Sequence, residues 1–235
     1  MARTIVCITE PFGRPKQFSD LVVFSDNRTY IPQWDTADYL NACRKYALQH
    51  QVYLVPSRFI VDDVLYLCLF GPDGSIVGVQ GATHLNLSHR DKLKQYHKAE
   101  VFPTPVGNIF LCVDVDIYYP EVLRLARLLG ADLVVSSQFI NTYELSRQMV
   151  TTGIWNAAQS NGIYVVGCCN CFSAVAAPWE ITPDQTGYLV PPAHTHSLFC
   201  KLFFNKLRHA EFGTPPRRQL NLPFIEKNLS ALCRR

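Results

Sequence analysis

Short apolar runs recur along the chain, and their lengths and composition predict β-strands. Each run covers four to seven residues, is rich in β-branched or other apolar side chains, and ends at polar residues, glycine or proline. The predicted strands cover residues 4–8, 21–24, 52–55, 64–70, 76–80, 109–115, 133–136 and 163–169. From about Gly187 onward, paired prolines amid polar residues predict a strand pair followed by an extended arm.

Three stretches between these strands show the apolar spacing of amphipathic helices. The first begins at Asp35 or Thr36, either of which can cap a helix. The second has Pro120 at its first position and Gly130 at its end, and the third covers residues 143–160. The expected inward residues are Leu40, Cys43, Ala47 and Leu48 in the first helix, Val122, Leu125, Leu128 and Leu129 in the second, and Leu145, Met149 and Ala158 in the third.

The order of these elements indicates a layered α/β or α+β domain. Gly71-Pro-Asp-Gly74 is a turn between two predicted strands, so residues 64–80 form an antiparallel hairpin. With 235 residues, 48% of them hydrophobic and 17% charged, the chain can bury one sizeable core. We therefore expect a single domain over residues 1–235, with an extended C-terminal arm from about residue 205.

Charge and cysteine content narrow the function classes. The 22 Lys and Arg exceed the 19 Asp and Glu by only three, and most are scattered, so neither nucleic acid nor a membrane is an expected partner. The apolar run at the start is too short for a signal peptide, and the nine cysteines lie mostly inside apolar runs. We expect a cytoplasmic protein with reduced, buried thiols, without cofactor or metal. The expected buried thiols include Cys7, Cys68, Cys112, Cys168 and Cys200.

Several short motifs occur in a fixed order along the chain. The strand Asp20-Leu-Val-Val-Phe-Ser-Asp26 is followed by the Pro-Asp-Gly hairpin and then by Ala82-Thr-His-Leu85. At the end of the predicted strand 109–115 begins the motif Asp114-Val-Asp-Ile-Tyr-Tyr-Pro-Glu121. In this order and spacing, the chain resembles the nitrilase superfamily of carbon-nitrogen hydrolases over nearly its whole length.

This resemblance implies a four-layer αββα sandwich, pairing of subunits through helical faces, and a Glu-Lys-Cys triad that attacks amides or nitriles. The triad positions correspond to Asp26, Ala82 and Asp114, so all three residues are replaced. Alanine cannot stabilise an oxyanion, and a carboxylate is no substitute for a thiolate. The chain also lacks the family's amino-terminal helix, because the segment joining its first two strands contains Pro11, Gly13 and Pro15.

Another thiol could in principle act in place of the missing one. Cys112 lies two residues before Asp114, on the same face of the predicted strand. Packing is the preferred interpretation, because an apolar site beside carboxylates raises the pKa of a thiol. A Cys112 beside Lys92 or Lys94 would instead restore thiol chemistry.

The replaced residues suggest a ligand site of different character. We place Asp26, Asp114, Asp116 and Phe139 in it, and the close carboxylates favour a cationic ligand such as an amine, a guanidine or a hard metal ion. The simpler alternative is that Asp114 accepts hydrogen bonds from backbone amides at the start of the helix that begins at Pro120.

Two functions follow from these observations. The first is a catalytically inactive protein of the nitrilase fold, which acts through assembly with itself or with an active relative, or through ligand binding. The alternative is an amide or nitrile hydrolase with altered chemistry, in which Asp26 and Asp114 act with water or a metal.

Overall fold

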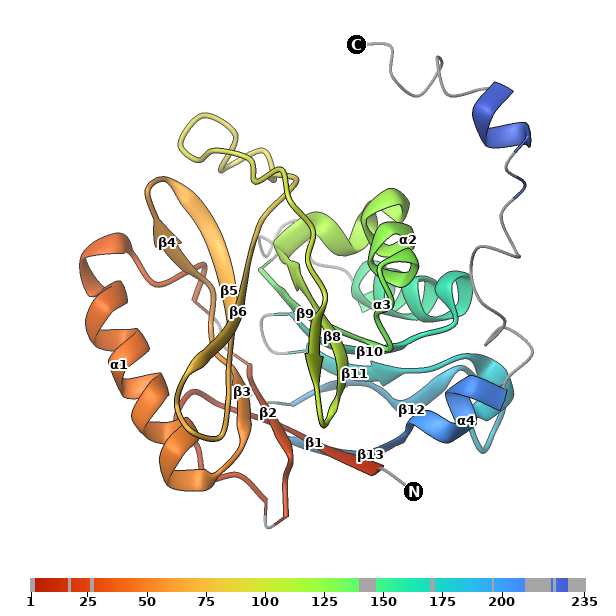
Figure 1. The fold of residues 1–235 in the computed structure, drawn as a ribbon, viewed down its shortest axis with the longest axis horizontal. Coiled ribbons are helices and arrows are strands. Elements are labelled where there is room, and N and C mark those ends of the chain that lie inside the picture. Colours follow the sequence, from red (N-terminus) through yellow and green to blue (C-terminus); the bar gives the residue numbers. More distant parts are fainter. Residues whose placement is uncertain are drawn as a thin grey trace.

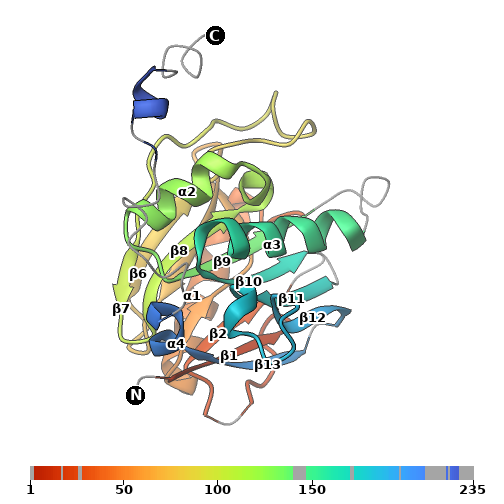
Figure 2. The ribbon, with the colours of Figure 1, turned by 90° about the vertical axis from the view of Figure 1, so that its right-hand side faces the viewer.

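The computed structural model describes residues 3–16, 18–25, 28–139, 147–169, 172–195, 197–209, 221 and 223–227. Two β-sheets stack face to face, and helices cover the outer face of each sheet (Figures 1 and 2). The expected αββα sandwich is therefore confirmed. In the described part of the segment joining the first two strands there is no helix, as the prolines and glycine there predicted.

The first sheet has seven strands in the order β13-β1-β2-β3-β5-β4, with β6 also paired to β5. Parallel pairing joins β1 to β2 and β2 to β3, and antiparallel pairing joins the others. The strands are β1 (Arg3–Thr9), β2 (Leu21–Phe24), β3 (Tyr53–Val55), β4 (Phe59–Val61), β5 (Val64–Phe70), β6 (Ile76–Gly81) and β13 (Leu198–Phe203).

The second sheet has six strands in the order β12-β11-β10-β9-β8-β7. Its central strands β8, β9 and β10 are parallel to one another. The strands are β7 (Phe102–Thr104), β8 (Gly107–Val113), β9 (Leu133–Gln138), β10 (Tyr164–Cys169), β11 (Phe172–Ala176) and β12 (Tyr188–His194).

Helices complete the outer layers. Helix α1 (Gln33–His50) covers the first sheet, while α2 (Pro120–Leu128) and α3 (Arg147–Asn161) cover the second (Figure 1). Two 3-10 helices, η1 (Asp114–Tyr118) and η2 (Trp179–Ile181), and a short helix α4 (Phe204–His209) complete the assignment. Within the described residues, no helix is both long enough and apolar enough to span a membrane.

Three apolar clusters hold these layers together. One lies between the two sheets and includes Val23 and Leu111, a second joins α1 to the first sheet, and a third joins α2 and α3 to the second. Burial of such surface contributes about 25 cal/mol per Å² of apolar area. The five cysteines expected to be buried are all buried and free of disulfides.

Most predicted strands agree with the structure within two residues, but the element that follows β8 differs. The predicted strand 109–115 ends at Val113, and Asp114 begins the 3-10 helix η1. Two strands follow Gly187 as predicted, but they do not pair with each other, because β12 pairs with β11 whereas β13 pairs with β1 in the other sheet. The region expected to form the arm begins with α4, whose Phe204 and Leu207 are buried against the body. Residues 223–227 lie away from the sandwich in both views (Figures 1 and 2).

The inward faces of two helices were partly mispredicted. Helix α1 begins at Gln33, after Pro32, and exposes Leu48 while burying Tyr46. Helix α2 buries Leu123 and Ala126, whereas Leu125 is 45% exposed and Leu129, just beyond the helix, is 48% exposed. The prediction places the leucines of both helices inward. Packing against the sheet sets the rotation of each helix, and this rotation decides which residues face inward. In the third helix Ala158 is buried as predicted, and Leu145 and the Met149 side chain lie outside the described part.

Candidate functional site

Asp114 stands at a sharp change of chain direction, directly after the central strand β8. Its φ of 51° lies in the left-handed region, which is uncommon for a residue other than glycine. Such backbone conformations cost about 1–3 kcal/mol and often occur where a strand end presents a functional side chain. Here the presented side chain is a carboxylate that is only 2% exposed.

The Asp114 carboxylate binds groups of the protein itself. Oδ1 accepts a hydrogen bond of 2.9 Å from the Phe139 backbone N–H, and Oδ2 accepts one of 2.9 Å from Asn86 Nδ2. Arg58 Nη1 lies 3.9 Å from Oδ1, and His89 Nδ1 lies 3.8 Å from Oδ2. The interpretation in which Asp114 binds backbone amides at the start of α2 is therefore wrong, since its backbone-amide partner is Phe139, directly after β9.

Arg58 supplies a buried positive charge beside this carboxylate. It is 1% exposed, and its Nη2 donates a 2.8 Å hydrogen bond to the Arg28 carbonyl. Its guanidinium carbon also lies 5.9 Å from the centre of the Phe139 ring. A buried carboxylate and a buried guanidinium compensate each other, so Asp114 has an internal cation without any ligand.

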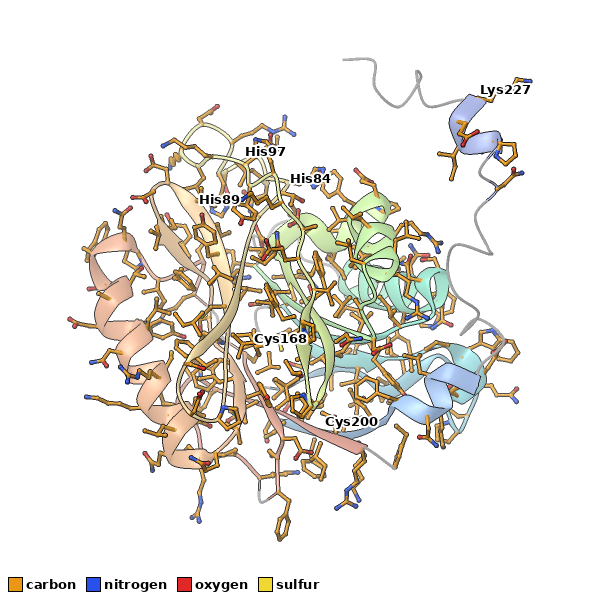
Figure 3. All side chains as sticks on the ribbon, in the orientation of Figure 1. His84, His89, His97, Cys168, Cys200 and Lys227 are labelled. Atoms are coloured by element: carbon orange, nitrogen blue, oxygen red, sulfur yellow. The ribbon has the colours of Figure 1, made fainter. Side chains whose placement is uncertain are left out.

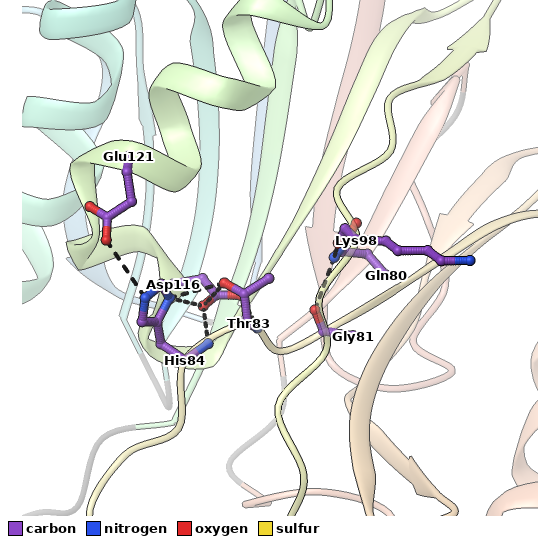
Figure 4. Close-up of polar contacts among 7 residues, drawn as sticks. All are labelled: Gln80, Gly81, Thr83, His84, Lys98, Asp116 and Glu121. Carbon is purple, nitrogen blue, oxygen red and sulfur yellow. Dashed lines mark hydrogen bonds and ion pairs between the residues drawn. The ribbon is translucent and has the colours of Figure 1, made fainter. Parts of the chain in front are cut away.

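Asp116 lies two residues further along η1 and binds the chain that follows β6. Its carboxylate accepts hydrogen bonds from Thr83 N at 3.0 Å, Thr83 Oγ1 at 2.8 Å and His84 N at 2.8 Å, and His84 Nδ1 lies 3.1 Å away (Figure 4). Burial raises the pKa of Asp116, although these hydrogen bonds partly offset the effect. Asp116 therefore positions the backbone at Thr83 and His84.

Asp114 and Asp116 both form hydrogen bonds with the long connection of residues 83–99, which we call the strap. Asn86 binds Asp114 through its amide, and its Oδ1 accepts a 3.1 Å hydrogen bond from His89 N. Figure 3 shows His84, His89 and His97, all on the strap, at the same end of the sandwich. The region in which the resemblance places a reactive thiol is thus where the strap is attached to the second sheet.

The other predicted site residues are Ala82, Phe139 and Asp26. Ala82 is fully buried beside the strap; its N–H donates to Leu65 O and its carbonyl accepts from Tyr96 N. Phe139 meets Asp114 through its backbone and Arg58 through its ring. Asp26 lies outside the described residues. Asp114 and Asp116 both belong to η1, which follows the end of β8 at Val113.

The Cys112 side chain is not exposed at this polar end of the sheet. It is fully buried in the apolar cluster between the second sheet and helices α2 and α3. Burial raises its pKa well above the usual range, and Asp116 raises it further. Lys94 is exposed and pairs with Asp63 at 2.9 Å. The thiol therefore stays protonated and serves for packing.

Arg58, Asn86 and His89 were not predicted from the sequence. A signal existed for Arg58, because an arginine between the apolar segments of β3 and β4 needs a buried partner if that stretch is interior. Nothing in the local sequence pairs it with Asp114, 56 positions away. Among the described residues, no group of three His, Cys, Asp or Glu side chains is arranged to hold a metal ion.

The environment of His89 predicts a pH dependence of stability. Burial lowers its pKa below the ordinary 6.5, the charges of Arg58 and Lys92 act in the same direction, and Asp114 opposes them. The unfolded chain then binds more protons than the folded one between the folded-state pKa and 6.5, so stability is lost as pH falls through that window. We expect the free energy of unfolding to fall below pH 6.5 in the wild type and to fall less in His89→Asn.

Urea unfolding between pH 5 and pH 7.5 measures this difference. His97→Asn, at an exposed position of the same strap, is the matched control and should keep the wild-type slope. Parallel curves for wild type and His89→Asn would show that His89 is not the titrating group.

Comparison with solved structures finds the same fold in carbon-nitrogen hydrolases. The carbon-nitrogen hydrolase of Helicobacter pylori G27 is 15% identical, with a TM-score of 0.79 over 97% of this chain and 98% of that chain. Nit3 of Saccharomyces cerevisiae, a member of branch 10 of the nitrilase superfamily, is 16% identical, with a TM-score of 0.71 over 92% and 97%. An amidase from Nesterenkonia sp. is 16% identical, with a TM-score of 0.68 over 92% and 96%.

No protein-family model matches the sequence, and the search of curated proteins found no match. The structural likeness nevertheless extends over nearly the whole chain, at 15 to 16% identity in these comparisons. The chain therefore has the fold of the nitrilase-superfamily carbon-nitrogen hydrolases.

Proposed function

We propose that this protein is a divergent member of the nitrilase superfamily that has lost the thiol mechanism and acts through assembly with itself or with a related chain. One observation carries the first part of the proposal. The carboxylate at the position matched to the nucleophile is buried and is bound by Phe139 and Asn86, with Arg58 beside it. A group engaged in this way is part of the folded structure and is not free to attack a substrate.

The chemistry of the lost mechanism supports the same conclusion. In the Nesterenkonia amidase, one structure has a covalent adduct at the active-site cysteine. The resemblance of the motifs to the family implies that this chain has Asp114 at the position of the nucleophile and Ala82 in place of the lysine. Losing a comparable oxyanion-stabilising donor costs about 3 kcal/mol in the barrier, and losing the nucleophile removes the covalent step altogether.

Purified protein is expected to release no ammonia from a panel of aliphatic amides and nitriles above a protein-free control. The reason is the absence of both nucleophile and oxyanion donor at the matched positions. Ammonia release is measured with and without Mg²⁺ and Zn²⁺. Release that persists on repurification and is abolished by Asp114→Asn would contradict the proposal.

The second candidate, a hydrolase of altered chemistry using Asp26 and Asp114, is favoured by one observation. His89 has a lowered pKa and lies 3.8 Å from Asp114, so a neutral imidazole beside a carboxylate is available as a general base. This candidate predicts ammonia release that His89→Asn abolishes, which makes the same assay decisive between the two.

The assembly part of the proposal rests on the outer side of α2. Leu125 and Leu129 are close to half exposed there, although the helical pattern suggested that they face inward. Exposed leucines on a helix and at its end are the kind of surface that a second subunit covers. An assembled protein would need no catalytic triad to have a function.

Leu129→Glu is expected to weaken self-association by about tenfold or more, because a charge replaces an apolar contact at the subunit interface. Mass photometry across a concentration series measures the change. Ile76→Glu is the control, since Ile76 is 51% exposed on the hairpin of the other sheet. A wild type that stays monomeric throughout and recovers no related chain in a pull-down would contradict assembly.

Location and ligands complete the proposal. Seven described cysteines are free and buried, which fits a reducing, cytoplasmic environment. We propose neither nucleic acid nor a membrane as partner, in keeping with the near balance of charge. A cationic small molecule beside Asp114 would have to compete with Arg58, which weakens that version of ligand binding.

A further inference from the structure

The His84 ring is held firmly in one orientation at the junction of the strap and α2. One face stacks on Tyr119, with ring centres 3.5 Å apart and planes 10° apart. Its Nδ1 lies 3.1 Å from Asp116 Oδ1 and 3.0 Å from Thr83 Oγ1. Stacking and hydrogen bonding together fix where the opposite ring nitrogen points.

These contacts also determine the tautomer of His84. The Asp116 carboxylate can only accept, and the Thr83 hydroxyl donates its hydrogen to that carboxylate at 2.8 Å. In the neutral form of the ring, Nδ1 therefore carries the hydrogen and Nε2 presents a lone pair. Nε2 lies 3.6 Å from Glu121 Oε1, so two acceptors face each other in this neutral form (Figure 4).

A surface cavity of about 350 Å³ opens beside this pair of acceptors. Its walls include His84 and Glu121 at the polar part, and Val122, Leu125 and Tyr96 as apolar surface. Lys98 also lines the cavity, but Figure 4 shows its ammonium group pointing away from His84 and Glu121. The polar end thus lacks an ammonium from Lys98 to satisfy the two acceptors.

We propose that this cavity binds a small organic cation that carries a primary ammonium or a guanidinium group on an apolar tail. The cation donates one hydrogen bond to His84 Nε2 and one to the Glu121 carboxylate, and the tail covers Val122 and Leu125. Charge-assisted hydrogen bonds of this kind are roughly twice as strong as neutral ones. The site is separate from Asp114. It shares Leu125, but not Leu129, with the surface proposed for assembly.

Titration of the ¹⁵N-labelled full chain with n-butylammonium chloride, in phosphate buffer at pH 7.5, tests this proposal. Saturable shifts of the Thr83, His84 and Val122 amides are expected. The neutral n-butanol should bind about tenfold more weakly or worse, because it lacks the charge. Glu121→Gln should weaken n-butylammonium binding by a similar factor, and it should fold normally because Glu121 is exposed.

Glu100→Gln, an exposed glutamate just beyond the strap, is the matched control and should bind like the wild type. Equal affinity for n-butanol and n-butylammonium, or equal affinity of wild type and Glu121→Gln, would overturn the proposal. Zn²⁺ binding at these amides without any n-butylammonium binding would also overturn it, in favour of a metal.

Discussion

Replacement of Asp114 by alanine is expected to lower the free energy of unfolding by about 3–5 kcal/mol. The substitution removes the carboxylate beside Arg58, which is 1% exposed. It also leaves the Phe139 N–H and the Asn86 amide without an acceptor that each now binds at 2.9 Å. Removing one member of a buried charged pair is among the most destabilising single changes in a protein core.

Urea denaturation at pH 7.5 measures this loss. Asp63→Ala is the control, because Asp63 forms an exposed ion pair with Lys94 at 2.9 Å. Such surface pairs contribute about 0–1 kcal/mol. If Asp114→Ala is no more destabilising than Asp63→Ala, then Asp114 is not a structural residue, and a role in ligand binding or catalysis becomes the better explanation.

Asp116→Ala is expected to cost about 3 kcal/mol and to release the start of the strap. The carboxylate now accepts hydrogen bonds from two backbone amides and the Thr83 hydroxyl and lies 3.1 Å from the His84 ring nitrogen, and a typical hydrogen bond contributes about 1 kcal/mol. The Thr83 and His84 amides should exchange hydrogen faster than in the wild type, because they lose their acceptor.

Hydrogen exchange followed by NMR reports these two amides individually. Asp116→Asn should show a smaller effect, since the amide oxygen of asparagine can still accept some of the hydrogen bonds that Thr83 and His84 donate. The amides of β10 serve as the internal reference. Exchange at Thr83 and His84 that matches the wild type, after correction for global stability, would contradict the attachment of the strap by Asp116.

Much of the fold could be predicted because its signals are local. Strand β5 and the hairpin to β6 follow from an apolar run and the Gly71-Pro-Asp-Gly74 turn, both contained within one stretch of sequence. The start of α2 at Pro120 follows from the fixed φ of proline. What failed was the choice of inward leucines in α2, because the packing against the sheet sets the helix rotation.

The candidate site was predictable only in part. The ordered motifs around Pro120 and Glu121 predicted that Asp114 lies at the end of a central strand. The partners of Asp114 could not be predicted, because Arg58 and His89 come from distant segments that are brought together only when the whole sandwich folds. The left-handed conformation at Asp114 could not be predicted either, because glycine is the residue that usually indicates such a turn and this position holds aspartate.

The central claim is that Asp114 forms an internal charge pair with Arg58 and does not take part in a reaction. A double-mutant cycle with Arg58 tests this claim most directly. Unfolding free energies of wild type, Asp114→Ala, Arg58→Met and the double variant give the coupling between the two side chains, since the other contacts of Arg58 cancel in the cycle. We predict a coupling of about 2 kcal/mol or more. A coupling near zero would contradict the claim.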